Sequence, residues 1–295
     1  MQPLLERLLN GETLLADGAM GSMLFKKGLK PGACPEELNL SQPEILQEIA
    51  KAYFETGADI IQTNTFGGSA MKLAEYGLDE KTEELNKAAV SIIKKVVQEK
   101  AYVSGSCGPS GQILQPFGMG DPEDFKKGFY RQINAMIEEG VDIICVETMT
   151  DLHEAIIAVK VAKEISPQTP VMATMTFEDT PKGFYTVMGV NIRDAADELQ
   201  KAGADIVGSN CGNGIEKMIK IAAEFRKVTD LPVLIQSNAG IPKNIAGQLE
   251  YPETPQFFAD KMPELLEIGV SIIGGCCGTT PETIKAMRAV LDSRK

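Results

Sequence analysis

The chain has no tryptophan and only one histidine, His153. A single histidine excludes a metal site with three histidine ligands and argues against a histidine-based catalytic triad. His153 lies in TDLHEA, which reads as the start of a helix, so we expect a surface or capping role for it. Aromatic residues make up 6% of the chain, which argues against an aromatic cage around a quaternary ammonium group.

Basic residues and long apolar runs are also scarce. The chain has 29 Lys and Arg against 41 Asp and Glu, a net charge of −12, which argues against a nucleic-acid partner. No apolar run approaches the roughly 18 residues of a membrane span. The N-terminus MQPLLERLLNGETLLADG lacks a basic segment followed by a long apolar one, so we expect no secretory signal and no membrane association. We expect a cytoplasmic protein whose six cysteines are thiols or metal ligands.

Short β-branched runs alternate with longer helical patterns eight times. The expected strands are TLLADGA, DIIQTNTF, AYVSGSCGPS, VDIICVETMT, PVMATMTF, ADIVGSNCG, PVLIQSNAG and VSIIGGCCG. The expected helices cover 43–56, 81–100, 123–139, 152–165, 192–202, 215–228, 255–268 and 281–291. Val- and Ile-rich strands separated by helices indicate a parallel sheet covered on both faces.

This eight-fold alternation predicts the fold. The phrase ETGADII recurs as EEGVDII, KAGADIV and EIGVSII, with a glycine between each helix and the next strand. Eight such units in this length predict an α/β (β/α)8 TIM barrel, a single domain spanning residues 1–295. The alternative, a doubly wound sheet, usually has fewer strands, and no glycine-rich dinucleotide fingerprint follows the first strand.

Polar residues gather where the expected strands end, which is the catalytic end of such barrels. They are Asp17, Gly18, Asn64, Cys107, Glu147, Thr176, Asn210, Cys211, Asn238, Cys276 and Cys277. A buried polar group without a partner costs about 1–3 kcal/mol. Their concentration therefore predicts a ligand, a metal or mutual hydrogen bonds at this rim, with Asn64 and Asn210 as candidate substrate-binding residues.

Three of the six cysteines are candidate metal ligands. Cys276 and Cys277 can reach one point only if the backbone leaves β geometry, and we expect Gly274, Gly275 and Gly278 to permit that turn. Cys211 ends the sixth strand, and only one strand separates it from the eighth. Three thiolates at one point suit a tetrahedral zinc ion with one open position. A vicinal disulfide and plain packing of buried thiols are the alternatives.

The other three cysteines give weaker signals. Cys145 lies in the middle of a strand and is expected to pack in the core. Cys34 has no identifiable partner in the sequence. Cys107 ends a strand, and the sequence leaves open whether it contacts the site.

A zinc ion with three thiolate ligands suits thiol chemistry. The site carries a net charge of −1, so it is a weak Lewis acid and a poor source of hydroxide. It suits a fourth sulfur ligand, whose pKa of about 8.5 it lowers while the sulfur stays nucleophilic. The predicted reaction is alkylation of a bound thiol. A hydrolase more commonly has histidine or carboxylate ligands and a nearby general base.

The motifs DGAMGSML, PEELNL, GADIIQTNTFGG, GPSG, VETMTD, GSNCGNG, SNAGIP and GGCCGTTPETI run almost from end to end of the chain. Together they resemble the zinc-dependent homocysteine S-methyltransferase family, most closely the homocysteine-binding barrel of cobalamin-dependent methionine synthase. The resemblance implies zinc ligands Cys211, Cys276 and Cys277, with the Asn238 carbonyl completing the shell before substrate arrives. It also implies that Asp17 and Glu147 hold the amino group of homocysteine, and that backbone amides after the first strand, at Gly18 and Ala19, hold its carboxylate.

The resemblance leaves the methyl donor open. We expect a methyl-corrinoid, methylcobalamin bound to a separate partner protein, because the chain holds one barrel. A small donor such as S-methylmethionine, another sulfonium or betaine is the alternative, and betaine is disfavoured by the scarcity of aromatics. A more distant alternative is a zinc- or thiol-binding protein without turnover, which would not need Asp17 and Glu147.

Overall fold

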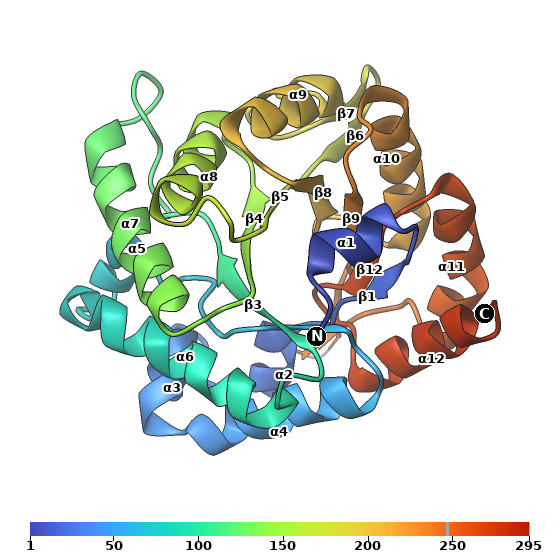
Figure 1. Cartoon of the computed structure of the whole chain (residues 1–295), viewed down its shortest axis with the longest axis horizontal. Helices are drawn as coiled ribbons and strands as arrows, with labels where there is room; N and C mark the ends of the chain where they lie inside the picture. The colour runs from blue at the N-terminus through green and yellow to red at the C-terminus, as the bar shows by residue number, and fades with distance from the viewer. Residues whose placement is uncertain (246–247, 295) are drawn as a thin grey trace.

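The structure, a computed structural model, describes residues 1–245 and 248–294. Its central sheet has eight parallel strands in the order β1-β12-β9-β8-β5-β4-β3-β2, and the bridge between Ala16 and Ile60 closes the ring. The bounds are β1 (Leu14–Leu15), β2 (Ile60–Gln62), β3 (Tyr102–Cys107), β4 (Ile143–Met149), β5 (Val171–Met175), β8 (Ile206–Asn210), β9 (Val233–Ser237) and β12 (Ile272–Gly275). Figure 1 shows the helices surrounding this barrel, so the predicted (β/α)8 fold is confirmed.

Eight long helices follow the eight strands. They are α4 (Pro43–Glu55), α6 (Thr82–Val97), α7 (Pro122–Glu138), α8 (Leu152–Ile165), α9 (Ile192–Ala202), α10 (Ile215–Val228), α11 (Pro255–Ile268) and α12 (Pro281–Asp292). Four match the predicted bounds, and the other four differ by one to three residues at an end. Local capping explains the sharp starts, because Asp151, Asn191 and Thr254 accept hydrogen bonds from backbone amides of α8, α9 and α11. Among the helices of the described residues, none is long and apolar enough to cross a membrane.

Several short elements were not predicted from the sequence. The helices are α1 (Leu4–Leu9), α2 (Met20–Lys26), α3 (Leu38–Ser41) and α5 (Ala70–Ala74), with 3-10 turns η1 (Pro35–Glu37) and η2 (Asp79–Lys81). Two antiparallel hairpins, β6 (Glu178–Thr180) with β7 (Gly183–Tyr185) and β10 (Lys243–Ile245) with β11 (Gln248–Glu250), follow β5 and β9. Both hairpins therefore extend the loops at the carboxyl ends of the strands.

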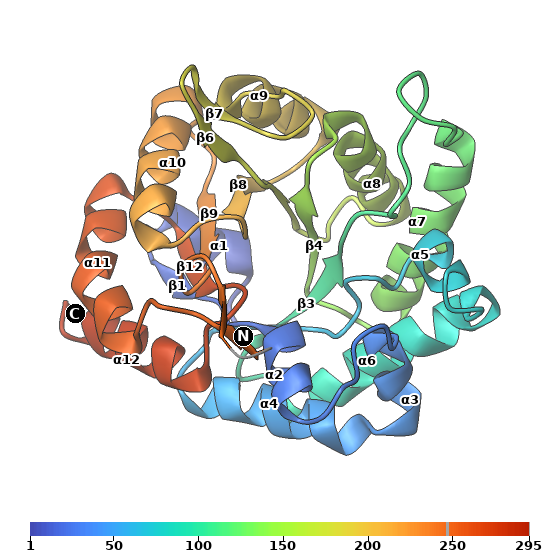
Figure 2. The same ribbon diagram turned by 180° about the vertical axis from the view of Figure 1, so that it is seen from behind.

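The barrel interior is apolar at one end and polar at the other. Leu14, Ile60, Ile143, Leu234 and Ile272 form an apolar layer that Leu4 and Leu8 of α1 cover. Because strand side chains alternate between faces, residues two positions further along point inward again. Gln62 and Gln236 lie two positions after Ile60 and Leu234, and Glu147 lies four positions after Ile143, so the polar layer lies at the carboxyl ends of the strands. Figure 2, which shows the molecule from behind with α2 in front, views this end.

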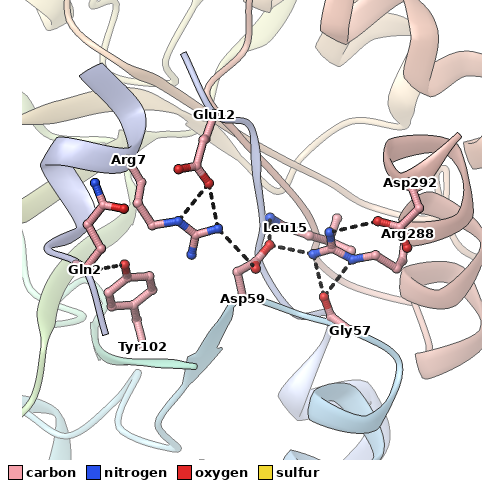
Figure 3. Close-up of polar contacts among 9 residues, drawn as sticks. All are labelled: Gln2, Arg7, Glu12, Leu15, Gly57, Asp59, Tyr102, Arg288 and Asp292. Atoms are coloured by element: carbon pink, nitrogen blue, oxygen red, sulfur yellow. Dashed lines mark hydrogen bonds and ion pairs between the residues drawn. The ribbon is translucent and has the colours of Figure 1, made fainter. Parts of the chain in front are cut away.

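Charged residues tie the chain ends together at the apolar end of the barrel. Asp59 Oδ2 accepts hydrogen bonds from Leu15 N at 2.9 Å and from Arg288 Nη2 at 2.5 Å. Arg7 of α1 lies 3.8 Å from the other Asp59 oxygen and pairs with Glu12 at 2.9 Å (Figure 3). Asp59 thus joins α1, β1 and α12 around the start of β2.

Candidate functional site

A cavity of about 250 Å³ opens at the polar end of the barrel. Its walls come from the ends of β2, β3, β4, β9 and β12 and from the loops after β1, β2, β8 and β12. Predicted site residues among its lining are Gly18, Ala19, Asn64, Glu147, Cys211, Cys276 and Cys277. Lining residues that the sequence did not single out include Gln62, Phe66, Ser106, Thr148, Gln236 and Glu36. The cavity therefore joins the three cysteines to a carboxylate within one enclosed space.

The three candidate ligands converge. The sulfur atoms of Cys211, Cys276 and Cys277 all lie within 4.8 Å of one another, and Cys211 Sγ is 3.9 Å from Cys277 Sγ. Zinc–sulfur bonds of about 2.3 Å in a tetrahedron place the sulfurs about 3.8 Å apart. All six cysteines are free thiols in this structure, so the cluster has the donor set and the spacing that a zinc ion takes.

Strained backbone presents Cys211 to the cavity. Its φ is +62°, and Gly212 follows with φ +73°. A left-handed conformation costs a residue other than glycine roughly 1–2 kcal/mol. Two hydrogen bonds hold it, from Cys211 N to Gln236 O at 3.1 Å and from Asn213 N to Cys211 O at 2.8 Å. Such strain is typical of functional sites.

The glycines around Cys276 and Cys277 differ from the sequence-based expectation. Only Gly278 has positive φ, at +82°. Gly274 and Gly275 lie in β12 and are needed for close approach instead. A Cβ atom at Gly275 would lie 2.2 Å from Thr279 Oγ1, and one at Gly274 would lie 2.8 Å from Ala16 Cβ. The turn therefore comes after the two cysteines rather than before them.

The three cysteine thiols of the cluster differ in pKa. Hydrogen bonds from Cys276 and Cys277 lower the pKa of Cys211, and the Asn238 side chain adds a further hydrogen bond. The same bonding to Cys211 raises the pKa values of Cys276 and Cys277. These opposite shifts favour a thiolate at Cys211 and protonated thiols at Cys276 and Cys277 when no metal is bound. Asn238 Oδ1 is buried without a hydrogen-bond partner, which leaves an oxygen donor beside the sulfurs.

Glu147 is held by three side chains at the cavity wall. Ser106 Oγ and Gln62 Nε2 donate to Oε1, the latter at 3.1 Å. Asn210 Nδ2 donates to Oε2 at 3.1 Å. Burial raises the pKa of Glu147 to about 7 despite these donors. A cationic partner in the cavity would favour its ionised form.

Asp17 lies beside Glu147 but is more enclosed. It is 2% exposed, and the cavity lining does not include it. Oδ2 accepts from Gln62 N at 2.9 Å, whereas Oδ1 is buried without a partner. Burial, with the nearby Glu147 charge, raises the pKa of Asp17 to about 8. The unpartnered oxygen is the open acceptor of this carboxyl group.

The predicted asparagines have structural partners. Asn64 lines the cavity, but its Nδ2 donates to Pro35 O at 2.7 Å and Asn39 Oδ1 at 3.1 Å. Asn210 is buried behind the wall, where Oδ1 accepts from Thr148 N at 2.7 Å. Thr148 has φ +58°, a true outlier for a β-branched residue. Asn210 therefore fixes the backbone next to Glu147.

The remaining cysteines and the histidine lie away from the cavity. Cys107 faces α7, where its Sγ donates to Gln132 Oε1 at 3.3 Å. Cys145 is fully buried in the barrel interior. Cys34, for which the sequence showed no partner, donates to Glu36 Oε2 at 3.3 Å. The His153 side chain is 85% exposed.

The residues missed by sequence reasoning are mostly uncharged. Gln62 and Ser106 could have been found by strand parity, since each faces inward two positions after a buried interior residue. Glu36, which accepts from Gly67 N at 2.7 Å, lies in the 3-10 turn η1, which carries no such periodicity.

Comparison with known proteins gives a consistent match. The family model described as Homocysteine S-methyltransferase matches residues 14–291. Methionine synthase of Mycobacterium leprae is 32% identical over 94% of this chain, and that of Mycobacterium tuberculosis is 31% identical over 98%. The chain spans only about a quarter of the length of these relatives, 24% and 25%.

Solved structures match in fold. The metallated form of the homocysteine methyltransferase MmuM from Escherichia coli has a TM-score of 0.81 at 23% identity, covering 97% of this chain and 99% of that one. A methyltransferase from Methanosarcina mazei has a TM-score of 0.62 at 14% identity, covering 99% and 98%. At these identities the likeness establishes the barrel architecture.

Proposed function

The chain belongs to the homocysteine S-methyltransferase family, and on that premise we propose that it methylates the thiol of homocysteine to give methionine. The observation that carries the proposal is one cavity that holds both a three-cysteine cluster and the buried Glu147. The cysteines suit a thiol-binding metal, and the carboxyl group suits the ammonium group of an amino acid. We propose that residues 1–295 form one homocysteine-binding barrel domain.

The donor set fits zinc, with Cys211, Cys276 and Cys277 as ligands. The unpartnered Asn238 oxygen is the candidate fourth donor before substrate enters. When bound, zinc supplies a lowered thiol pKa, so that the substrate sulfur is present as a nucleophilic thiolate. The anionic ligand set keeps electron density on that sulfur, which suits attack on a methyl carbon better than hydrolysis.

The protein's own residues orient the amino acid. Glu147 and the open oxygen of Asp17 are proposed to accept hydrogen bonds from the ammonium group. Charge-assisted hydrogen bonds of this kind contribute roughly 1.5–3 kcal/mol each. The carboxylate is proposed to lie against the backbone after Gly18, although the Ala19 amide already donates to Thr279 Oγ1 at 3.2 Å.

We propose a methyl-corrinoid on a separate protein as the donor. The thiolate sulfur attacks the methyl carbon, and the electron pair of the carbon–cobalt bond stays with the corrinoid. Eight of the fourteen large apolar side chains exposed in the described part of the chain lie on loops after β2, β3, β7 and β9. They are Phe66, Ile113, Phe117, Met119, Val187, Met188, Ile241 and Leu249. These loops surround the polar end of the barrel, which a partner protein carrying the donor would have to approach.

A small donor is the second candidate, because the MmuM structures show the same architecture. Betaine, a quaternary ammonium donor, is usually bound within a cage of aromatic side chains. The cavity lining contains one aromatic residue, Phe66, so betaine has less support than a sulfonium donor. A zinc-binding protein without turnover would leave Asp17 and Glu147 without a role.

The proposal is tested by methyl transfer. Purified protein is incubated with homocysteine and methylcobalamin, S-methylmethionine or betaine in turn, with zinc and after chelation. Methionine formed from methylcobalamin only with zinc is the expected result. Formation from a small donor alone would replace the corrinoid with that donor, and no methionine from any donor would contradict catalysis.

A further inference from the structure

Thr279 connects the two halves of the site. Its Oγ1 donates to Cys276 O at 2.7 Å and accepts from Ala19 N at 3.2 Å. One hydroxyl group thus bonds the backbone of a candidate metal ligand and the backbone after β1. Thr279 is 1% exposed, so water does not compete for these bonds. A hydroxyl group is both donor and acceptor, which an isosteric valine is not.

Tyr53 strengthens the same connection from outside the barrel. It is fully buried on α4. Its hydroxyl group lies 3.0 Å from Ala19 O and 3.3 Å from Thr279 O, so its single proton is shared between the two loops. Tyr53 belongs to neither loop and contacts both.

The backbones of the loops after β1 and β12 are in close contact. Gly275 N donates to Asp17 O at 2.9 Å. A Cβ atom at Gly18 would lie 2.7 Å from Thr279 Oγ1 and 2.9 Å from the Tyr53 hydroxyl oxygen. On the far side, Gly278 N donates to Ser22 Oγ of α2 at 3.0 Å. A shift of Cys276 would therefore move the loop after β1.

We propose that Thr279 and Tyr53 are positioning residues that couple metal binding at the cysteines to binding of the substrate's amino-acid group. The inference rests on the proposed function. Zinc would hold the loop after β12, and the amino-acid group would hold the loop after β1. Because Thr279 and Tyr53 join these loops, each ligand tightens binding of the other by the same factor. The metal site then favours the homocysteine backbone before any sulfur–metal bond forms.

The test separates this coupling from the sulfur–metal bond. L-2-Aminobutyrate has the ammonium and carboxylate groups of homocysteine but no thiol. The zinc Kd is measured by competition with a chromophoric chelator, without and with saturating L-2-aminobutyrate, and the ratio is the coupling factor. For the wild-type protein we expect a coupling factor of roughly five or more, with zinc bound more tightly when L-2-aminobutyrate is present. Thr279→Val should bring the factor to about one, Thr279→Ser should restore it, and Tyr53→Phe should lower it.

Thr283→Val is the matched control. Thr283 is also buried, but its hydroxyl group bonds only within the start of α12, to Thr280 N at 3.3 Å. This variant should keep the wild-type factor. An unchanged factor in Thr279→Val, or a loss that Thr279→Ser does not restore, would overturn the inference. A wild-type protein that binds both ligands with a factor of one would also overturn it and leave the proposed function intact. Failure of L-2-aminobutyrate to bind at all would instead count against the proposed substrate site.

Discussion

Asn210 Oδ1 accepts a hydrogen bond from Thr148 N at 2.7 Å. Asn210 directly precedes Cys211, and Thr148 directly follows Glu147. The same asparagine donates to Glu147 Oε2. A single hydrogen bond therefore links the residue next to Cys211 with the residue next to Glu147. Its two partners are 62 residues apart in the sequence.

Replacing Glu147 with glutamine should weaken homocysteine binding and leave zinc bound. The amide keeps the shape of the carboxyl group but loses its charge. We expect KM for homocysteine to rise about tenfold or more, since 1.4 kcal/mol corresponds to one decade. Reaction with 3-mercaptopropionate, a thiol without an ammonium group, is the control and should be nearly unaffected. Equal loss with both thiols would instead assign Glu147 to support of the fold or the metal.

The metal-free protein should lose stability as pH rises from about 5 to about 8. The folded-state pKa values of Glu147 and Asp17, about 7 and about 8, exceed the ordinary values of 4.5 and 3.8. The folded state therefore binds more protons, and the unfolding free energy falls with pH in this window, on the order of a few kcal/mol in total. Glu147→Gln and Asp17→Asn stay neutral, so urea denaturation should show a flatter profile for each. A wild-type profile that rises across this window would refute the prediction.

Zinc binding should release about two protons near neutral pH. In the metal-free cluster the lowered pKa of Cys211 favours its thiolate, whereas the raised pKa values of Cys276 and Cys277 favour their protonated thiols. Zinc affinity should thus increase about a hundredfold per pH unit. Chelator competition across pH measures the slope. Cys145→Ala, which removes a thiol outside the cluster, should keep it, while a slope near zero would exclude ligation by protonated cysteines.

Glycine at position 98 or 99 should stabilise the fold. Gln98 and Glu99 have φ of +48° and +61°, and each pays a steric cost that glycine avoids. Each substitution should raise the free energy of unfolding by about 0.5–1 kcal/mol. The neighbouring Lys100→Gly, at a position without positive φ, should lower it instead. Urea denaturation of the three variants compares them directly.

Sequence periodicity predicted the barrel well because its strands and helices repeat one physical pattern. Eight helices and eight strands were expected near their observed places, and the polar end of the barrel followed from the residues at which the strands end. Local geometry was less accessible. The positive φ of Cys211 and Thr148 depends on bonds from Gln236 and Asn210, which are distant in sequence. Only such contacts distinguish the cavity-lining Glu147 from the enclosed Asp17.

The hairpins after β5 and β9 were missed for another reason. Each hairpin strand has three residues, which is too short for alternation to be recognised. The tight fit of Thr279 against Gly18 and Gly275 was likewise invisible, because a glycine's neighbours are set by the fold and not by its flanking sequence.

The cluster around Asp59 determines where a fusion partner or a solid support can be joined through the N-terminus. Arg7 and Gln2 belong to the first residues of the chain, and both are fixed at the barrel end opposite the cavity (Figure 3). Any polypeptide, tag or solid support joined ahead of Met1 would therefore lie at the barrel end opposite the cavity. The cavity would point outward, with its approach free for a donor as bulky as a whole protein.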